Sequence, residues 1–412
     1  EATGELLGDV AASYVGPVAV LDVGQDGTLD LVARNPAEGF QLLLQKEGLF
    51  VPEGFPYPAL EGAAYQRCLV GDLQHKGSLM GGRQEDFMLL SDQGTQVFRV
   101  SPSGMLSDSS LFAQIAGVVL EEAVVHDLDL TGKLDLIGLN ATNRSLMFFR
   151  NQGNFSFIDQ TSSTNLPTHI EGIHQFVFDD WDGDDRLDLF LALPDQAPSL
   201  WLRQRGGGFV ETNLLSRVPP SRGLVVGDVN NDLRMDVVSL GSRKLHLTIQ
   251  GDEEGVNIGD ELEAIRRIDL WDFDNDGWLD ILGSGGGRVR VWRNRGLEGF
   301  TEVTTRLGLS ELDLGGEIGA WSFADLDNDC DTDLLLTLAN QSIKVLRNDG
   351  GNQNQQLKIR LEGTRSNPSG LGVKLEVTSG GLRMMRTVHS LPIEIGMGQR
   401  QRVDAIDPHW SD

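Results

Sequence analysis

Acidic side chains recur in this sequence at a spacing that suits a metal ion. In the clearest case Asp272, Asp274, Asp276 and Asp280 occupy positions 1, 3, 5 and 9 of one short segment, with Gly277 at position 6. A hard cation such as Ca²⁺ prefers about six to eight oxygen ligands at about 2.3–2.6 Å. Without a cation, so many carboxylates close together would repel one another strongly. The pattern therefore predicts a calcium-binding loop.

The positions of this nine-residue pattern have different expected roles. Alternate residues of a tightly curled loop point inward, so positions 1, 3 and 5 would supply side-chain oxygens. Position 7 would offer its backbone carbonyl, which explains why its residue type varies, and glycine at position 6 permits a positive φ. Position 9 would open the next strand and close the cage. An EF-hand is not expected, because position 12 lacks the bidentate Glu and apolar runs flank the loop.

Six segments of the chain carry the pattern and provide the predicted metal ligands. These are Asp22, Asp26, Thr28 and Asp30; Asp127, Asp129, Thr131, Lys133 and Asp135; Asp180, Asp182, Asp184, Arg186 and Asp188; Asp228, Asn230, Asp232, Arg234 and Asp236; Asp272, Asp274, Asp276, Trp278 and Asp280; and Asp325, Asp327, Asp329, Asp331 and Asp333. The first segment has Gly24 where a second acidic residue is expected. The alternative for any single copy is an Asp-capped hairpin turn without metal. Regular recurrence favours calcium, at about five or six ions per chain.

A seventh copy of the pattern is broken. It begins at Asp72 and keeps Gly77, but Gln74 and Lys76 replace the inner acids, and its closing aspartate is Asp86 after an insertion. We expect this copy to hold no ion, because the Lys76 ammonium would lie where a cation would bind.

The copies mark a repeat built from short strands. Their first aspartates lie 44 to 55 residues apart, and each loop is followed by an apolar run such as LDLIGL or LDILGS. A second run often ends in Arg-Asn, as in VRVWRN, which predicts a turn. Four strands of about five residues with their turns occupy about 45–50 residues, the size of one propeller blade. We therefore predict an all-β fold: a seven-bladed β-propeller over residues 1–350 and a small β-domain over residues 351–412.

The repeated motif resembles the FG-GAP/VCBS-type repeat, which is known from integrin α-subunit propellers and many bacterial secreted proteins. The resemblance covers roughly residues 10–350. It implies an extracytoplasmic protein, secreted or periplasmic, that serves in binding or adhesion and has no established enzymatic activity. It also fits an affinity suited to extracellular calcium, at about 10⁻⁴–10⁻³ M.

The C-terminal residues resemble a second family, the ASPIC and UnbV domain. The first element of that domain is matched by Asn367, Gly370, Gly372 and Leu375, and its G-L-G element by residues 396–398. A terminal V-x-W element is matched loosely by residues 407–410. The segment between these elements is short and the chain stops early for this family, so we expect either an abbreviated or a truncated domain.

The main alternative function is a polysaccharide-active enzyme, a lyase or glycosidase, because paired carboxylates can act as general acid and base. The repeat accounts for every Asp cluster and leaves no surplus pair. The seven His residues are scattered without zinc spacing, and no nucleophile or phosphate-loop motif is present. We therefore expect a protein that is not an enzyme.

The favoured function is a scaffold that recognises an extracellular protein or glycan. The tryptophans at 181, 201, 271, 292 and 321 are expected to pack in the core, whereas the loop position of Trp278 predicts exposure. The insertion at 71–86 is a candidate contact site because breaks in repeats often carry function.

Charge and cysteine content restrict the partners. With 61 acidic and 34 basic residues the formal net charge is −27, which disfavours nucleic acid. No apolar stretch is long enough for membrane insertion. Cys68 and Cys330 could pair or stay as buried free thiols, so they leave the compartment and the oligomeric state open.

Overall fold

The computed structural model describes residue 7 and residues 10–75, 85–101, 103–252, 255–259, 265–363, 367 and 369–410. Strands dominate this part of the chain. The described helices are short: α2 (Val10–Ser13), α3 (Ser110–Ala113) and the 3₁₀ turns η2 (Gly296–Glu298) and η3 (Gly351–Gln353). No helix of these ranges is long and apolar enough to cross a membrane.

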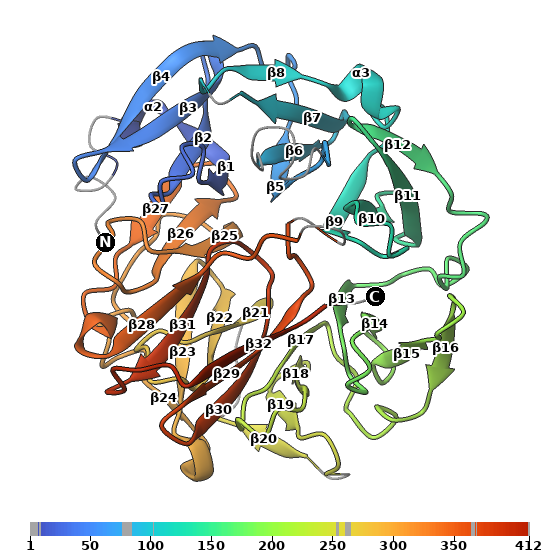
Figure 1. The fold of residues 1–412 in the computed structure, drawn as a ribbon, viewed down its shortest axis with the longest axis vertical. Helices are drawn as coiled ribbons and strands as arrows, with labels where there is room; N and C mark the ends of the chain where they lie inside the picture. Colours follow the sequence, from blue (N-terminus) through green and yellow to red (C-terminus); the bar gives the residue numbers. More distant parts are fainter. Residues whose placement is uncertain are drawn as a thin grey trace.

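The described strands β1 to β27 form seven consecutive antiparallel sheets, six with four strands and one with three. Sheets 1 to 6 are β1–β4, β5–β8, β9–β12, β13–β16, β17–β20 and β21–β24, and sheet 7 is β25–β27. Figure 1 shows the sheets arranged around a common centre, as the blades of a β-propeller. The predicted all-β propeller is confirmed. The number of blades, seven, stays a prediction, and the seven sheets agree with it.

Strand order within each sheet follows the chain from the centre outward (Figure 1). The innermost strands are β1 (Val15–Leu21), β5 (Tyr65–Gly71), β9 (Leu120–His126), β13 (Gln175–Asp179), β17 (Gly223–Gly227), β21 (Arg267–Trp271) and β25 (Ile318–Ala324). The second strands are β2 (Asp30–Asn35), β6 (Asp86–Ser91), β10 (Asp135–Asn140), β14 (Asp188–Ala192), β18 (Asp236–Leu240), β22 (Asp280–Gly285) and β26 (Asp333–Leu338). Each second strand therefore begins with an aspartate, as predicted for position 9.

The outer strands complete the sheets. The third strands are β3 (Gly39–Lys46), β7 (Gly94–Val100), β11 (Leu146–Gly153), β15 (Ser199–Arg203), β19 (Leu245–Thr248), β23 (Arg288–Asn294) and β27 (Ile343–Leu346). The fourth strands are β4 (Leu49–Tyr57), β8 (Leu106–Asp108), β12 (Ser156–Asp159), β16 (Phe209–Thr212), β20 (Val256–Ile258) and β24 (Phe300–Glu302). The second strands are almost wholly buried, because each packs between two neighbouring sheets.

Apolar clusters between adjacent sheets hold the ring together. Between sheets 1 and 2, for example, Phe87 stacks on Phe98 with ring centroids 4.9 Å apart, and Phe40 packs beside them. The first and last sheets also meet, because the amide of Gly16 donates to the carbonyl of Gln341 at 2.8 Å. This contact closes the ring of sheets.

Five further strands form a C-terminal unit, here residues 355–410. They are β28 (Gln355–Ile359), β29 (Lys374–Ser379), β30 (Leu382–Thr387), β31 (Ile393–Gly398) and β32 (Ala405–His409). β28 pairs with β31, and β29 lies between β30 and β32. Its buried side chains, such as Leu375 and Val388, belong to the same apolar cluster as Leu136 and Phe149 of sheet 3. The unit lies against the sheets, in front of them in Figure 1.

Candidate metal centres

The aspartate-rich segments all connect a first strand to a second strand, so they lie on one side of the propeller, here called the loop side. Loop 1 is residues 22–30, and loops 3 to 7 are residues 127–135, 180–188, 228–236, 272–280 and 325–333. Loop 2, between β5 and β6, is the broken copy; residues 76–84, with Lys76 and Gly77, lie outside the described residues.

The aspartate at position 1 shapes every one of these six loops. One carboxylate oxygen accepts the amide of position 5 and the other accepts the amide of position 6. In loop 6, for example, the Asp276 and Gly277 amides donate to Asp272 at 3.1 and 3.0 Å. The same pair of bonds forms at Asp22, Asp127, Asp180, Asp228 and Asp325. The predicted inward turn of position 1 is thus stabilised by the loop's own backbone.

The aspartate at position 9 joins the loop to the rest of its sheet. In loop 6 the Asp280 carboxylate accepts the amides of Phe273, at 3.2 Å, and of Asn294 on β23, at 2.6 Å. Equivalent pairs form at Asp30, Asp135, Asp188, Asp236 and Asp333. Position 9 is therefore a structural residue as well as a candidate ligand.

Two positions of each loop have a positive φ. Position 6 does so as predicted, at Gly27, Gly132 and Gly277, but also at Asp185, Leu233 and Cys330, where no glycine is present. Position 4 does so as well, and asparagine occupies it in loops 5, 6 and 7, at Asn231, Asn275 and Asn328. Asparagine tolerates this conformation better than most residues. The asparagines at position 4 therefore indicate a positive φ, which our sequence-based prediction did not include.

Carboxylate oxygens come together in four of the loops. Oxygens of three aspartates lie within 4.8 Å of one another in each of these groups: Asp127, Asp129 and Asp135; Asp180, Asp182 and Asp184; Asp272, Asp274 and Asp276; and Asp325, Asp327 and Asp333. Positions 1 and 3 belong to every group. Among the described residues, loops 1 and 5 form no such carboxylate group, in keeping with Gly24 and Asn230 at their third positions.

Buried oxygens without hydrogen-bond partners test whether these loops suit a cation. Among the described residues, Oδ1 of Asp274, Oδ1 of Asp327 and Oγ1 of Thr131 are buried and accept no hydrogen bond. The other oxygen of Asp274 lies 2.6 Å from Arg293. An oxygen left without a partner in such a site costs free energy that a bound cation would recover. The donor set is thus compatible with Ca²⁺ in loops 3, 6 and 7.

Burial and crowding raise the pKa values of these carboxyl groups. Burial, followed by the neighbouring Asp129, raises the pKa of Asp135 to about 8. Burial, followed by Asp276, raises the pKa of Asp272 to about 7, and burial raises the pKa of Asp333 to about 8. Such shifts mean that the ionised form is destabilised in the metal-free loop, which a divalent cation would reverse.

Arginines of the same sheets pair with the inner acids. Arg150 contacts Asp129, and Arg293 lies 2.6 Å from Asp274 and 3.0 Å from Asp276. In loops 4 and 5 the arginine at position 7 takes this role, with Arg186 on Asp184 and Arg234 on Asp232. The side chain of position 7 therefore folds back over position 5, and the ligand role predicted for its backbone carbonyl stays a prediction.

Loops 1 and 2 differ from the others. In loop 1 the Thr28 hydroxyl donates to Asp26 at 2.5 Å, so its side chain is already bonded. In loop 2, Asp86 is confirmed as the equivalent of position 9, because it opens β6 and accepts the amide of Val100 at 3.3 Å. The expectation that loop 2 holds no ion rests on Lys76, outside the described residues, and stays a prediction.

The C-terminal unit brings cationic side chains to the loop side. Lys358 contacts Asp325, Arg360 contacts Asp22, and Lys374 contacts Asp180, each at position 1 of a loop. In loop 5 the amide of Met385 donates to Asp228 at 3.0 Å. These partners could not be predicted from the sequence, because they depend on how the unit packs on the propeller. Through these contacts the C-terminal unit packs on loops 1, 4, 5 and 7.

Side chains at the ends of the third strands link neighbouring sheets. Each donates to the backbone carbonyl of position 2 in the preceding loop: Gln45 to Leu326, Asn151 to Leu73, Arg203 to Leu128, Gln250 to Trp181, Asn294 to Val229 and Asn348 to Phe273. The Arg-Asn endings predicted only a turn, so the sequence interpretation missed this role. At the equivalent place in sheet 2 stands Val100, which has no side-chain donor.

Other sequence expectations have mixed outcomes. Trp181, Trp292 and Trp321 are buried as expected, but Trp278 is only partly exposed, because its ring lies against the turn at Gly296. The cysteines are both free thiols, and Cys330 is exposed rather than buried.

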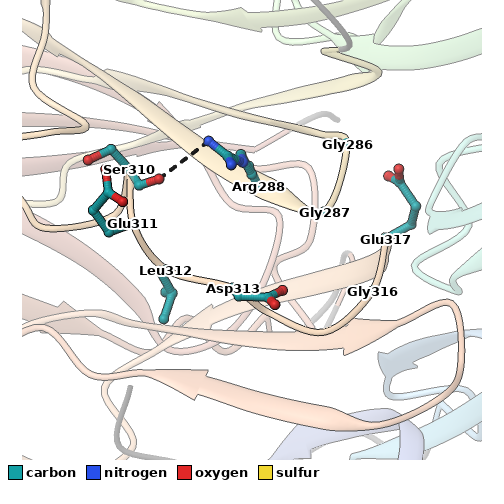
Figure 2. A pocket seen from close by; sticks show the side chains of 9 residues that line it. All are labelled: Gly286, Gly287, Arg288, Ser310, Glu311, Leu312, Asp313, Gly316 and Glu317. Carbon is teal, nitrogen blue, oxygen red and sulfur yellow. Dashed lines mark hydrogen bonds between the residues drawn. The ribbon is translucent and has the colours of Figure 1, made fainter.

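A hollow of about 500 Å³ lies on the other side of the propeller, between the turn at Gly286 and Gly287 and the 310–317 segment (Figure 2). Arg288 points across it and donates to the Ser310 carbonyl at 3.4 Å. No predicted site residue lines this hollow, and Gly286 and Gly287 form the turn between β22 and β23.

Comparisons with known proteins support the repeat. Residues 127–191, 180–239 and 272–336 match the FG-GAP-like repeat. These three matches cover loops 3 to 7 and support an FG-GAP repeat propeller. No curated protein matches the chain.

Solved structures share the fold at low sequence identity. A lectin from Agrocybe aegerita, described for its specific recognition of non-reducing terminal N-acetylglucosamine, is 17% identical with a TM-score of 0.51; the match covers 70% of this chain and 79% of the lectin. BBS1N in complex with ARL6DN, in a lead-soaked crystal, is 11% identical with a TM-score of 0.47, over 81% of this chain and 91% of BBS1N. The match to the lectin shows that the fold of this chain is similar to that of a protein of known structure.

Proposed function

We propose that this protein is a secreted or periplasmic calcium-binding propeller that serves as a binding module. The observation that carries the proposal is the set of buried oxygens at Asp274, Asp327 and Thr131 that accept no hydrogen bond inside aspartate-rich loops. Ca²⁺ in these loops would complete their oxygen ligands and fix the first and second strands of each sheet relative to one another. The extracytoplasmic location is supported by the FG-GAP-like repeat and fits the millimolar calcium found there.

The ions we propose number about five or six, one in each of loops 1 and 3 to 7. Support is greatest for loops 3, 4, 6 and 7, where three carboxylates converge. Positions 1 and 3 would be the principal ligands, with position 5 or 9 as the third. The bound ions would make the formal net charge of −27 less negative and would remove the repulsion between carboxylates on the loop side.

The partner we propose is an extracellular protein or glycan, bound without catalysis. Support comes from the position-9 carboxylates, which are used by the backbone, and from the absence of a surplus acid pair in the sequence. The C-terminal unit contacts the loop side through Lys358, Arg360 and Lys374. Recognition would therefore occur on the opposite side or at the outer edges of the sheets.

The resemblance of the C-terminal unit to the ASPIC and UnbV domain is part of this proposal. Its motif residues have clear structural roles, which supports it. The Asn367 side chain donates to the Leu371 carbonyl at 2.6 Å, and Gly370 and Gly372 have φ angles of 67° and 84°.

Thermal unfolding of the purified chain in EDTA and in millimolar Ca²⁺ tests the proposal. We expect a large rise in Tm with Ca²⁺, because a ligand that binds only the folded state stabilises it by mass action. Mg²⁺ at the same concentration is the control, since it demands a smaller octahedral site. An unchanged Tm in Ca²⁺ would refute the calcium-binding role.

A further inference from the structure

The innermost strands surround a hollow at the centre of the propeller. Two adjoining parts of it measure about 440 and 340 Å³, and both are lined by Val124, His126 and Asp269. Residues 385–395 of the C-terminal unit line its end at the loop side. Access therefore comes from the opposite side, where the first residues of the innermost strands lie.

Charged residues gather at that opposite end. Arg67 lies 3.2 Å from Glu122, so this pair is neutral. Within the described part of the chain, Arg267 at the start of β21 forms no ion pair of this kind: its guanidinium lies over the Trp321 ring, 4.6 Å from the centroid. Asp269, two residues on, instead accepts the Trp321 indole N–H at 2.9 Å.

The Arg267 guanidinium retains a free donor. Among the described residues, its Nη1 is buried and has no hydrogen-bond partner. Burial, followed by repulsion from Arg67, lowers the pKa of Arg267 to about 10, so the group is still charged at neutral pH. A buried, charged donor without an acceptor is costly, and an anion beside it would recover that cost.

Valine side chains line the middle of the hollow beside Asp269, and its inner part offers a second donor. Because alternate residues of a strand face the same side, Val124, Val177 and Val225 line it between the charged end and the C-terminal unit. Trp271 lies four residues after Arg267, about 13 Å along the strand, and its Nε1 is also buried without a partner. This is the usual composition of a ligand pocket: apolar walls with a few placed polar groups.

We propose that the central hollow binds a small organic carboxylate, with its anionic group on Arg267 and its apolar part against the valines. The planar fork of a guanidinium matches a carboxylate and favours it over a spherical anion. The inference rests on the proposed binding role but not on metal in the loops. A chain that binds calcium but no carboxylate would overturn this inference alone.

Isothermal titration calorimetry on the full chain in Ca²⁺ tests whether the central hollow binds a carboxylate. The probes are benzoate, 4-phenylbutanoate and naphthalene-2-acetate, each with its uncharged amide, and inorganic phosphate. We expect at least one carboxylate to bind about tenfold or more tightly than its amide and than phosphate. In Arg267→Gln that affinity should fall about tenfold or more, whereas Arg288→Gln, which alters an arginine outside the central hollow, should leave it unchanged.

A second variant tests the inner donor independently of Arg267. Trp271→Phe keeps an aromatic ring, although a smaller one, and removes the indole donor, so it should weaken binding of a probe that reaches this donor. Tm values of both variants show whether they fold. No binding by any carboxylate, equal binding of the amides or of phosphate, or wild-type affinity in a folded Arg267→Gln chain would each overturn the proposal.

Discussion

The side-chain amide of Gln45, in the first sheet, donates to the backbone carbonyl of Leu326, in the loop of the last sheet. These residues are 281 positions apart, and their contact is one of six equivalent links between neighbouring sheets. A hydrogen bond of this kind connects two neighbouring sheets of the ring. It also restrains the loop whose position-2 carbonyl accepts it.

Loss of the Gln45 link should destabilise the ring. In Gln45→Ala the Leu326 carbonyl loses its side-chain donor, which we expect to cost about 1–2 kcal/mol and to lower Tm. The matched control is Gln204→Ala, since the exposed side-chain amide of Gln204 donates, among the described residues, only to the carbonyl of Leu202 two residues away. Equal Tm values for the two variants would show that the inter-sheet link does not stabilise the fold.

Asp274→Asn should change stability in opposite directions with and without metal. In EDTA at pH 8 the variant should be more stable by roughly 1–2 kcal/mol, because burial and the neighbouring Asp276 raise the pKa of Asp274 to about 6. In millimolar Ca²⁺ it should be less stable than the wild type, because loop 6 loses the charge of one ligand. Asp195→Asn, at an exposed turn, should shift Tm in neither condition. A change of the same sign in both conditions would contradict a metal role for Asp274.

Stability in EDTA should fall as pH rises. Folded-state pKa values are raised, chiefly by burial, to about 7 at Asp188 and Asp236 and to about 8 at Asp135 and Asp333. The folded protein therefore binds more protons than the unfolded chain between about pH 4 and pH 8, so protonation stabilises it at the acidic end of this window.

Calcium should reverse that dependence, because it binds ionised carboxylates. The Tm difference between millimolar Ca²⁺ and EDTA should increase from pH 5 to pH 8. Melting curves at pH 5, 6.5 and 8 in both conditions measure it. A Tm difference that stays constant across this range would argue against metal binding at these carboxylates.

Lys374→Met should increase the dependence on calcium. Lys374 and Asp180 form a buried ion pair, and removing one partner of such a pair typically costs about 3–5 kcal/mol. In EDTA we expect a loss of that order, and in Ca²⁺ a much smaller one, because the ion in loop 4 then neutralises Asp180. The control is Arg383→Met, which breaks the more exposed pair with Glu376 and should cost less than about 1 kcal/mol. An equal Tm loss in EDTA and in Ca²⁺ would mean that Asp180 binds no metal.

The local parts of this molecule could be predicted from the sequence. Each loop is nine residues long, so its turn, its position-9 aspartate and the strand that follows are set by neighbours along the chain. Asp280 opens β22 and Gly277 has a positive φ, as expected. The repeat also predicted the propeller, because copies of one unit at similar spacing pack against one another.

The contacts between distant segments could not be predicted. The linking side chain is Gln45 in one sheet, Arg203 in another and Asn294 in a third, so no single residue type marks the position. The pairing of Lys358 with Asp325 depends on how the C-terminal unit packs on the loop side. A spacing rule within a repeat holds no information on such contacts.

Counting bound calcium tests the central claim most directly. The purified chain is dialysed against millimolar Ca²⁺ and then measured by elemental analysis, beside a variant in which Asp129, Asp182, Asp274 and Asp327 at position 3 are all changed to alanine. The account predicts about five or six ions in the wild type and about four fewer in the variant. A folded wild-type chain without bound calcium, or an equal count in both proteins, would contradict it.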